Sequence, residues 1–278
     1  MKKELIFWTR EIGWEPSYKN FDEEKAINLL QYAYSQWITY FDTAPIYWNW
    51  KSEELLGRAL KNERKNIKII TKFWIVNNEF IYTWESIHQE LANSLQRLQT
   101  DYIDIYLLHI PEWTIPVDNI INTLESLKNA WKIKAYWVAN CQWKLLKEFI
   151  QKGNIEYVQD FYNLMDLSIE KNIFPQLKDS QFFMSYSPLY RWLLTDQSIQ
   201  ELLQKNEGAI NRLLKNNNLK SVLKRSQALK QIAKQQNLSI TEFAYKFLFS
   251  KEQNNAVLVG TTSKKHLDEA IKYWKKYT

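Results

Sequence analysis

Short apolar segments alternate with amphipathic segments through almost the whole chain, and this alternation constrains the fold more than any other feature. Eight segments have the length and composition of strands, at residues 5–8, 40–43, 67–72, 103–109, 133–138, 157–161, 182–186 and 256–259. Helical spacing of apolar residues occurs at 22–35, from 52 onwards, and at 84–98, 117–129, 145–151, 173–178, 221–236, 241–250 and 263–274. Strands that alternate with helices indicate βαβ units and a parallel sheet. Eight of them favour an α/β fold, a closed (β/α)₈ TIM barrel.

A doubly wound sheet is the main alternative arrangement. In such a fold a G-x-G-x-x-G motif would be expected at the start of a helix, and none of the predicted helices begins with this motif. The 278 residues suffice for two small domains, but no linker of low complexity divides them. We therefore expect one barrel domain over residues 1–278. Within it, residues 196–220 are polar, and Asn216, Asn217 and Asn218 predict a loop.

Charge and cysteine content argue against several classes of function. The net charge is +6, from 37 Lys plus Arg against 31 Asp plus Glu, but the lysines are scattered over the predicted helices. Nucleic-acid binding is therefore not expected. Cys141 is the single cysteine, and no Cys and His set has zinc spacing, so we expect neither an intramolecular disulfide nor a metal. The first apolar run is too short for a signal peptide, and no stretch approaches the ~18 apolar residues of a membrane span, which predicts a cytoplasmic protein.

Four polar side chains lie where predicted strands end. Asp42 and Tyr47 share the loop after the strand at 40–43. Lys72 and His109 end the strands at 67–72 and 103–109. Because the carboxyl ends of parallel strands meet on one face of a barrel, we expect the four to converge. Each one alone is commonly a turn, packing or solvated residue; their combination favours an active site. Ser52, at the start of the next helix, is expected to be its N-cap.

At these motifs the sequence resembles the aldo-keto reductases. The similarity covers nearly the whole chain and is most specific in F-D-T-A-x-x-Y, S-E-E-L-L-G, I-I-T-K-F, D-I-Y-L-L-H, V-Q-x-x-Y-N and Y-S-P-L. The resemblance implies reduction of aldehydes or ketones to alcohols, with a catalytic tetrad of Asp42, Tyr47, Lys72 and His109. Tyr47 would donate the proton and Lys72 would lower its pKa. Asp42 would hold Lys72, and His109 would orient the carbonyl oxygen.

The resemblance also implies a nicotinamide cofactor at the mouth of the barrel. It places Asn140 and Gln159 at the carboxamide, Tyr186 against the nicotinamide ring, and Ser187 and Leu189 at the pyrophosphate. The segment after the last strand resembles the family's 2′-phosphate pocket and adenine contact, and its matching residues are Gly260, Thr261, Lys264, His266 and Glu269. Hydroxyls, lysines and backbone N–H groups at a helix start suit an anion, which favours NADPH. His266 stands where many members have Arg, so NADH stays open.

Two other functions remain open. One is an NAD-linked aldose dehydrogenase working in the oxidative direction. The other is a barrel that binds the cofactor as a sensor or as a subunit of a larger assembly, against which the intact tetrad argues. The expected partner is a small carbonyl or sugar substrate, and a monomer or weak oligomer is expected.

The chain has 13 Trp and only 5 Gly, whereas ordinary proteins contain about 7% Gly. Eight tryptophans fall where the resembling family commonly has glycine: Trp8, Trp37, Trp48, Trp50, Trp74, Trp131, Trp137 and Trp192. Random substitution does not produce this bias. We therefore hypothesise that these are UGA codons read as glycine in the source organism. The alternative is a genuinely Trp-rich pocket, in which Trp48 would crowd the substrate. The remaining tryptophans have no such assignment: Trp14, Trp84, Trp113, Trp143 and Trp274.

Overall fold

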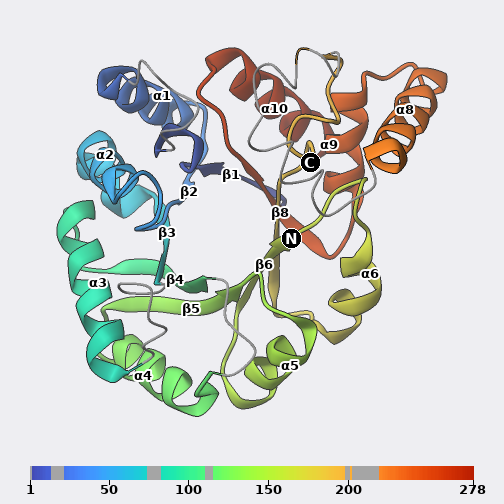
Figure 1. Ribbon diagram of the computed structural model, residues 1–278. Coiled ribbons are helices and arrows are strands. Elements are labelled where there is room, and N and C mark those ends of the chain that lie inside the picture. Colours follow the sequence, from blue (N-terminus) through green and yellow to red (C-terminus); the bar gives the residue numbers. More distant parts are fainter. Residues whose placement is uncertain (1, 14–21, 74–82, 110–114, 198–200, 202–218) are drawn as a thin grey trace.

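Eight parallel strands close into a barrel in the order of the sequence, and β8 pairs with β1. The computed structural model describes the chain except for residues 1, 14–21, 74–82, 110–114, 198–200 and 202–218. Helices surround the strands on the outside (Figure 1). The (β/α)₈ barrel predicted from the sequence is confirmed. Asn216, Asn217 and Asn218, the predicted loop, lie outside the described residues.

The strands and helices occupy most of the predicted segments, with small shifts at their ends. The strands are β1 Glu4–Trp8, β2 Tyr40–Asp42, β3 Lys68–Phe73, β4 Ile103–His109, β5 Ile133–Ala139, β6 Tyr157–Phe161, β7 Phe182–Tyr186 and β8 Asn254–Val259. The α-helices are α1 Glu23–Ser35, α2 Lys51–Leu60, α3 Trp84–Leu98, α4 Val117–Asn129, α5 Trp143–Lys152, α6 Ser168–Asn172, α8 Leu219–Gln235, α9 Ile240–Ser250 and α10 Lys264–Tyr277. Three 3-10 turns accompany them: η1 Glu11–Gly13, η3 Lys61–Asn66 and η4 Phe174–Gln176.

Several helices begin at polar residues that satisfy their first N–H groups. The carboxylate of Asp22 accepts two backbone hydrogen bonds from the first turn of α1, at 3.0 and 3.1 Å. Thr83 and Ser86 form a reciprocal capping box at the start of α3. Ser239 accepts one backbone N–H at the start of α9, at 3.0 Å. Each such cap stabilises a helix by about 1 kcal/mol.

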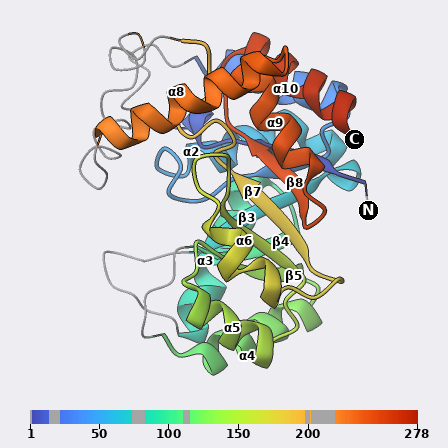
Figure 2. The ribbon, with the colours of Figure 1, turned by 90° about the vertical axis from the view of Figure 1, so that its right-hand side faces the viewer.

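One continuous apolar core joins the strands to the inner faces of the helices. All residues of β4 are buried, as expected for a parallel strand covered on both faces. Ile120, Leu124 and Leu127 of α4 pack into this core. A smaller cluster joins the segments that follow β6 and β7 to α8 and α9, which lie together at the top of Figure 2.

Ser52 is not the N-cap of α2, so this prediction is wrong. The helix begins at Lys51, and its N-cap is Trp50, which makes no side-chain capping bond. The Ser52 hydroxyl is buried and lies 2.5 Å from Oγ1 of Thr9 and 3.0 Å from Oγ1 of Thr43. Tertiary partners after β1 and β2 therefore engage the hydroxyl instead of the helix's own N–H groups.

The short helix predicted at residues 173–178 is also wrong. α6 lies earlier, at Ser168–Asn172, and the 3-10 turn η4 follows it. Pro175 lies in η4 and explains the difference, because proline has no N–H and disfavours helical backbone in the residue before it.

Candidate active site

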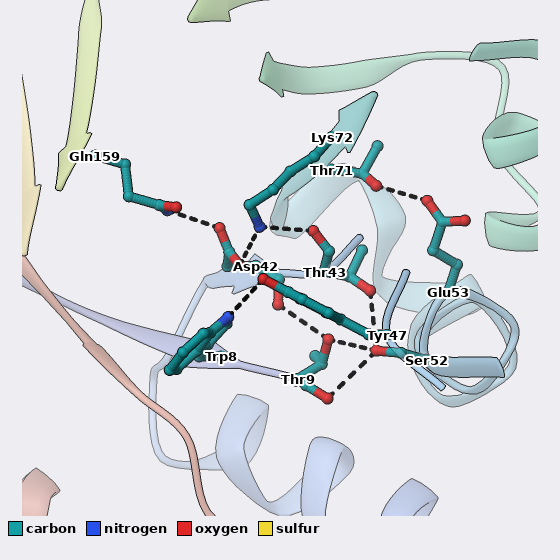
Figure 3. A network of polar contacts seen from close by, with 10 residues as sticks. All are labelled: Trp8, Thr9, Asp42, Thr43, Tyr47, Ser52, Glu53, Thr71, Lys72 and Gln159. Carbon is teal, nitrogen blue, oxygen red and sulfur yellow. Dashed lines mark hydrogen bonds and ion pairs between the residues drawn. The ribbon is translucent and has the colours of Figure 1, made fainter. Parts of the chain in front are cut away.

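The side chains of Asp42, Tyr47, Lys72 and His109 come together at the carboxyl ends of β2, β3 and β4. Asp42 ends β2, Lys72 lies one residue before the end of β3, and His109 ends β4. Tyr47 lies in the turn that leads from β2 to α2. Its ring centroid is 5.0 Å from Nζ of Lys72 and 6.2 Å from the centroid of the His109 ring. Figure 3 shows how three of these side chains face one another.

Lys72 and Asp42 form a buried ion pair. Nζ of Lys72 donates to Oδ1 of Asp42 at 2.5 Å and to the backbone carbonyl of Thr43 at 2.8 Å. The amide of Gln159 donates to the other carboxylate oxygen of Asp42 at 2.8 Å. Burial lowers the pKa of Lys72, but Asp42 and Tyr47 together, through their charges and hydrogen bonds, more than offset it, so this pKa lies above its ordinary value. Burial also raises the pKa of Asp42, against the attraction of Lys72. Lys72 is therefore an ammonium at neutral pH.

Tyr47 keeps its proton at neutral pH. Burial raises the pKa of its phenol above the ordinary value, and the nearby charge of Lys72 lowers it by less. The sequence-based scheme, in which Lys72 lowers this pKa, describes the direction of one contribution but not the net result. A protonated phenol beside an ammonium suits a group that gives up its proton only as a negative charge develops on the acceptor.

His109 is a neutral imidazole at neutral pH. Burial lowers its pKa well below the ordinary value, and the positive charges of Lys72 and Arg10 lower it further. A neutral imidazole carries one N–H donor. Its ring stands perpendicular to that of Tyr47, with the ring centroids 6.2 Å apart, so both side chains could contact the same small group.

The indole of Trp8 lies against Tyr47 on the side of β1. Its Nε1 donates to the Tyr47 hydroxyl at 2.9 Å, and the two rings meet edge to face at 6.3 Å. The guanidinium of Arg10 lies 5.3 Å from the centroid of the Trp8 ring. Sequence reasoning named Trp48 as the residue that crowds the substrate, but the hydrogen bond to Tyr47 comes from Trp8. Trp8 ends β1 and pairs with Asp42, which ends β2. Its position at a strand end, like that of Asp42, is the sequence signal that could have identified it.

A second polar network ties the loops of the site to the surrounding helices (Figure 3). The hydroxyl of Thr9 donates to the backbone carbonyl of Asp42 at 3.0 Å. The buried carboxylate of Glu53 in α2 accepts hydrogen bonds from Thr71 of β3 and from Arg97 of α3, both at 2.6 Å. Sequence reasoning missed Glu53, because an acidic residue in the first turn of a helix is ordinarily exposed.

The three residues that the resemblance assigns to the nicotinamide lie on neighbouring strands: Asn140 follows β5, Gln159 lies in the middle of β6, and Tyr186 ends β7. The hydroxyl of Tyr186 donates to the side-chain oxygen of Asn140. Gln159 donates its amide to Asp42 and so connects this group to the tetrad. The Tyr186 ring lies 5.8 Å from that of Trp8.

The two residues assigned to the pyrophosphate follow β7. The backbone carbonyl of Ser187 accepts a hydrogen bond from the Asn163 side chain at 3.1 Å. Leu189 is partly buried and packs against both apolar clusters. Ser187 has a positive φ of 57°, which turns the chain sharply after the strand.

Gly260 follows β8 at a place where a side chain does not fit. A Cβ there would come within 2.9 Å of the Glu11 side chain and 3.1 Å of the Trp8 ring. The hydroxyl of the buried Thr261 accepts the backbone N–H of Ser263 at 3.0 Å. Gly260 therefore lies beside Trp8, which contacts the tetrad through Tyr47.

The first turn of α10 combines backbone N–H groups with two lysines and a histidine. It contains Lys264, Lys265 and His266 and no acidic residue. Such a helix start suits a phosphate, so these residues fit the anionic end of a dinucleotide. The His266 ring lies 5.0 Å from that of Trp192, and Glu269 accepts a hydrogen bond from Tyr273 at 3.2 Å.

Within the described residues there is no group of His, Cys, Asp and Glu arranged to hold a metal ion. Among the described helices, none has both the length and the apolar character needed to cross a membrane.

A parallel barrel with a buried polar set at the carboxyl ends of its strands has the arrangement of a barrel enzyme. The model of the Aldo/keto reductase family matches residues 4–278. The chain belongs to this family, whose activity in general is NAD(P)H-dependent carbonyl reduction.

Two relatives and one solved structure illustrate the similarity. Aldo-keto reductase YhdN of Bacillus subtilis (strain 168) is 35% identical over 187 residues, which cover 65% of this chain and 56% of that relative. The NADH-specific methylglyoxal reductase of Escherichia coli (strain K12) is 27% identical over 283 residues, which cover 95% of this chain and 87% of that protein. The crystal structure of the thermostable aldo-keto reductase Tm1743 with the inhibitor epalrestat matches with a TM-score of 0.76 at 26% identity, covering 98% of this chain and 89% of that one.

Proposed function

We propose that this protein reduces aldehydes or ketones to alcohols with NADPH, and that Tyr47 donates the proton. The protonated, buried phenol of Tyr47 beside the Lys72 ammonium and the neutral His109 carries the proposal. Carbonyl reduction needs a hydride on carbon and a proton on oxygen. The bound cofactor supplies the hydride, and the protein must supply the proton and stabilise the developing negative charge.

Each of the four side chains then has a separate role. Asp42 fixes Lys72 through their ion pair, and the ammonium stabilises the phenolate that Tyr47 becomes after it has given up its proton. The N–H of the neutral His109 donates to the carbonyl oxygen and orients it. Gln159 of β6, across the barrel from β2, donates a hydrogen bond to the Asp42 carboxylate and so restricts its orientation.

Three groups of residues would bind the parts of the cofactor. Asn140, Gln159 and Tyr186 bind the nicotinamide, and Ser187 and Leu189 bind the pyrophosphate. The adenosine end is bound by the residues that follow β8: Gly260, Thr261, Lys264, His266 and Glu269. The cations at the start of α10 support a 2′-phosphate and hence NADPH. The name of the Escherichia coli relative, an NADH-specific enzyme, is the observation that favours NADH as the alternative.

We further propose that residues 1–278 form one catalytic barrel domain, which works in the cytoplasm as a monomer or weak oligomer. Its substrate is a small carbonyl compound or sugar. Family membership supports this reading, because a barrel of this kind contains both the cofactor site and the tetrad.

The test is the oxidation of NADPH and of NADH with a panel of small aldehydes, ketones and sugars. We expect turnover with NADPH, and we expect Lys264→Ala to lower kcat/KM for NADPH about tenfold with little change for NADH, the effect of losing about 1.4 kcal/mol of charge-assisted binding. Faster reduction of NAD⁺ by an aldose would favour the dehydrogenase reading. Tight cofactor binding without turnover of any carbonyl would favour a sensor or subunit.

A further inference from the structure

Five tryptophans have a backbone conformation that side chains disfavour. Their φ angles are positive, at 72° for Trp37, 51° for Trp48, 67° for Trp50, 59° for Trp131 and 74° for Trp192. In this left-handed region Cβ crowds the following carbonyl, and bulky residues are genuine outliers there. Glycine has no Cβ and adopts the region freely. Yet within the described part of the chain no glycine has a positive φ.

Two of these tryptophans stand at the helix-terminating position where glycine is the usual residue. The N–H of Trp37 bonds to the carbonyl of Tyr34 at 2.9 Å, and the next N–H bonds to the carbonyl of Ala33 at 3.2 Å. This pair of bonds is a Schellman motif at the end of α1, with Trp37 at its left-handed C′ position. Trp37 is 77% exposed, so burial of its indole does not offset the strain.

The end of α4 repeats the arrangement. The N–H of Trp131 bonds to the carbonyl of Lys128, and the next N–H bonds to the carbonyl of Leu127, both at 3.0 Å. Trp131 is 82% exposed. The same motif ends α8 with Asn237 at the left-handed position, and asparagine is the usual alternative to glycine there.

The other three lie in the loops that shape the active site. Trp48 and Trp50 occupy two of three consecutive left-handed residues between Tyr47 and α2. Trp192 ends a left-handed run after β7, where its ring packs against His266.

Two further tryptophans lie in strands, and the argument at each concerns its indole N–H rather than its φ angle. Trp137 in β5 is fully buried, and its indole N–H has no hydrogen-bond partner among the described residues. A buried donor without a partner is destabilising. Trp8 places its indole N–H on the hydroxyl of Tyr47.

The three described tryptophans without a predicted glycine counterpart behave as ordinary residues. Trp84 and Trp143 begin α3 and α5 with helical backbone, and Trp274 lies within α10. Trp274 is buried, and its indole donates to the backbone carbonyl of Lys3 at 2.9 Å. A positive φ thus separates the five tryptophans at positions 37, 48, 50, 131 and 192 from these three without any reference to other proteins. Trp74 lies outside the described residues, as do Trp14 and Trp113.

We propose that the protein made in its own cells carries glycine at positions 37, 48, 50, 131 and 192, where the backbone is left-handed. We extend the proposal to position 137, where the buried indole N–H has no partner among the described residues, and to position 8, where the indole occupies the hydroxyl of Tyr47. A UGA codon translated as glycine accounts for all seven positions at once. Tryptophan at positions 84, 143 and 274 is then genuine.

Position 8 connects this proposal to the active site, and this step rests on the proposed function. Glycine there removes the indole that hydrogen-bonds to Tyr47 and frees the phenol to meet a carbonyl oxygen. Position 8 therefore decides access to the proton donor. We expect Trp8→Gly to lower KM for carbonyl substrates with a smaller effect on kcat.

Peptide mass spectrometry of the protein isolated from its source cells tests the residue identities directly. We expect glycine at positions 37 and 131 and tryptophan at positions 84 and 274, together with TGA codons at the first pair and TGG at the second. Tryptophan at 37 and 131 in the native protein would overturn the proposal.

Thermal unfolding of the recombinant protein tests the backbone argument independently. We expect Trp37→Gly and Trp131→Gly each to raise the melting temperature by about 2–4 °C, since each removes one strained residue. Trp84→Gly is the matched control: its residue is also exposed but helical, so its melting temperature should stay equal or fall. Equal responses in all three variants would contradict the strain argument. Neither readout depends on catalysis, so failure of the reductase proposal would leave both results intact.

Discussion

At the residue scale, the neighbours of a buried tyrosine determine what its hydroxyl can do. The hydroxyl of Tyr47 lies between Trp8 and the Lys72 ammonium, whereas that of Tyr106 in β4 is equally buried but has no hydrogen-bond partner among the described residues. The same side chain is thus a candidate proton donor at one position and an uncompensated polar group at the other.

Replacing either tyrosine by phenylalanine removes one hydroxyl with little change of shape. We predict that Tyr47→Phe lowers kcat at least about 100-fold, because the proton donor is lost, and leaves NADPH affinity within about threefold. Tyr106→Phe should keep kcat and unfold with an equal or higher free energy, since it removes a buried hydroxyl without a partner. Steady-state kinetics and urea unfolding measure both; equal loss of kcat in the two variants would argue against the role of Tyr47.

Asp160 in β6 gives a prediction for pH. Burial raises the pKa of its carboxyl to about 7 in the fold, whereas 3.8 is the ordinary value. The folded protein therefore holds a proton between about pH 4 and 7 that the unfolded chain has released, so this group lowers stability as the pH rises through that window, by about 4 kcal/mol in total.

The variant Asp160→Asn keeps an oxygen for the Phe161 N–H, which Asp160 accepts at 2.6 Å. We predict that it unfolds with a higher free energy than the parent at pH 8 and with a similar one at pH 4. Urea unfolding over that pH range measures the difference. A parallel pH dependence in both proteins would mean that Asp160 is not the group responsible.

At the scale of elements, the contact between α2 and α3 depends on a glycine. A Cβ at Gly57 would lie 2.7 Å from the backbone carbonyl of Leu98 and 2.8 Å from that of Arg97. These are backbone atoms, so the helices must move apart to admit a methyl group. Gly57→Ala should therefore destabilise the fold by about 1–3 kcal/mol, although alanine is the better helix former. Gln96→Ala, on the exposed face of α3, is the control and should change stability by less than about 0.5 kcal/mol; unfolding in urea compares them.

The same helix pair holds a buried charge. Glu53 is fully buried and is paired with Arg97 at 2.6 Å. We predict that Arg97→Met destabilises the protein by about 3–5 kcal/mol, because it leaves the carboxylate uncompensated. The double variant Glu53→Gln, Arg97→Met should recover much of this loss in thermal unfolding. A double variant no more stable than the single one would show that packing of the arginine, rather than its charge, stabilises the contact.

At the scale of the whole molecule, closure of the barrel assembles the site from distant parts of the chain. Asp42 of β2 meets Gln159 of β6, and Trp8 of β1 meets Gly260 after β8. Because the proposed cofactor site spans these segments, NADPH should stabilise the whole barrel, by about 2.7 kcal/mol at a concentration 100 times its Kd. Thermal unfolding with NADPH and with NADH measures this shift, and Tyr47→Phe should keep it. An unchanged melting temperature at saturating NADPH would contradict the assigned site.

The barrel and the residues at its mouth follow from local patterns along the chain. The spacing of apolar residues in strands and in helices is a property of residues close together in the sequence. The eight alternating strand and helix segments can therefore be predicted before the fold is known. Parallel strands place their carboxyl ends together, which brings Asp42, Lys72 and His109 to one face without further information. Two predictions from local patterns are wrong. The helix around Pro175 is misplaced because proline restricts the backbone there, and Ser52 is not a cap because its hydrogen-bond partners lie in other loops.

How these residues are paired and charged depends on the closed barrel. The pKa of Tyr47 is raised because the closed barrel removes water from the phenol, which no local pattern reports. The bond between Gln159 and Asp42 joins residues that lie far apart in the chain. Backbone φ angles, too, became known only in the fold, and they distinguish Trp37 and Trp131 from Trp84. Sequence fixes periodicity because it is local, whereas desolvation, pairing and strain arise only when the barrel closes.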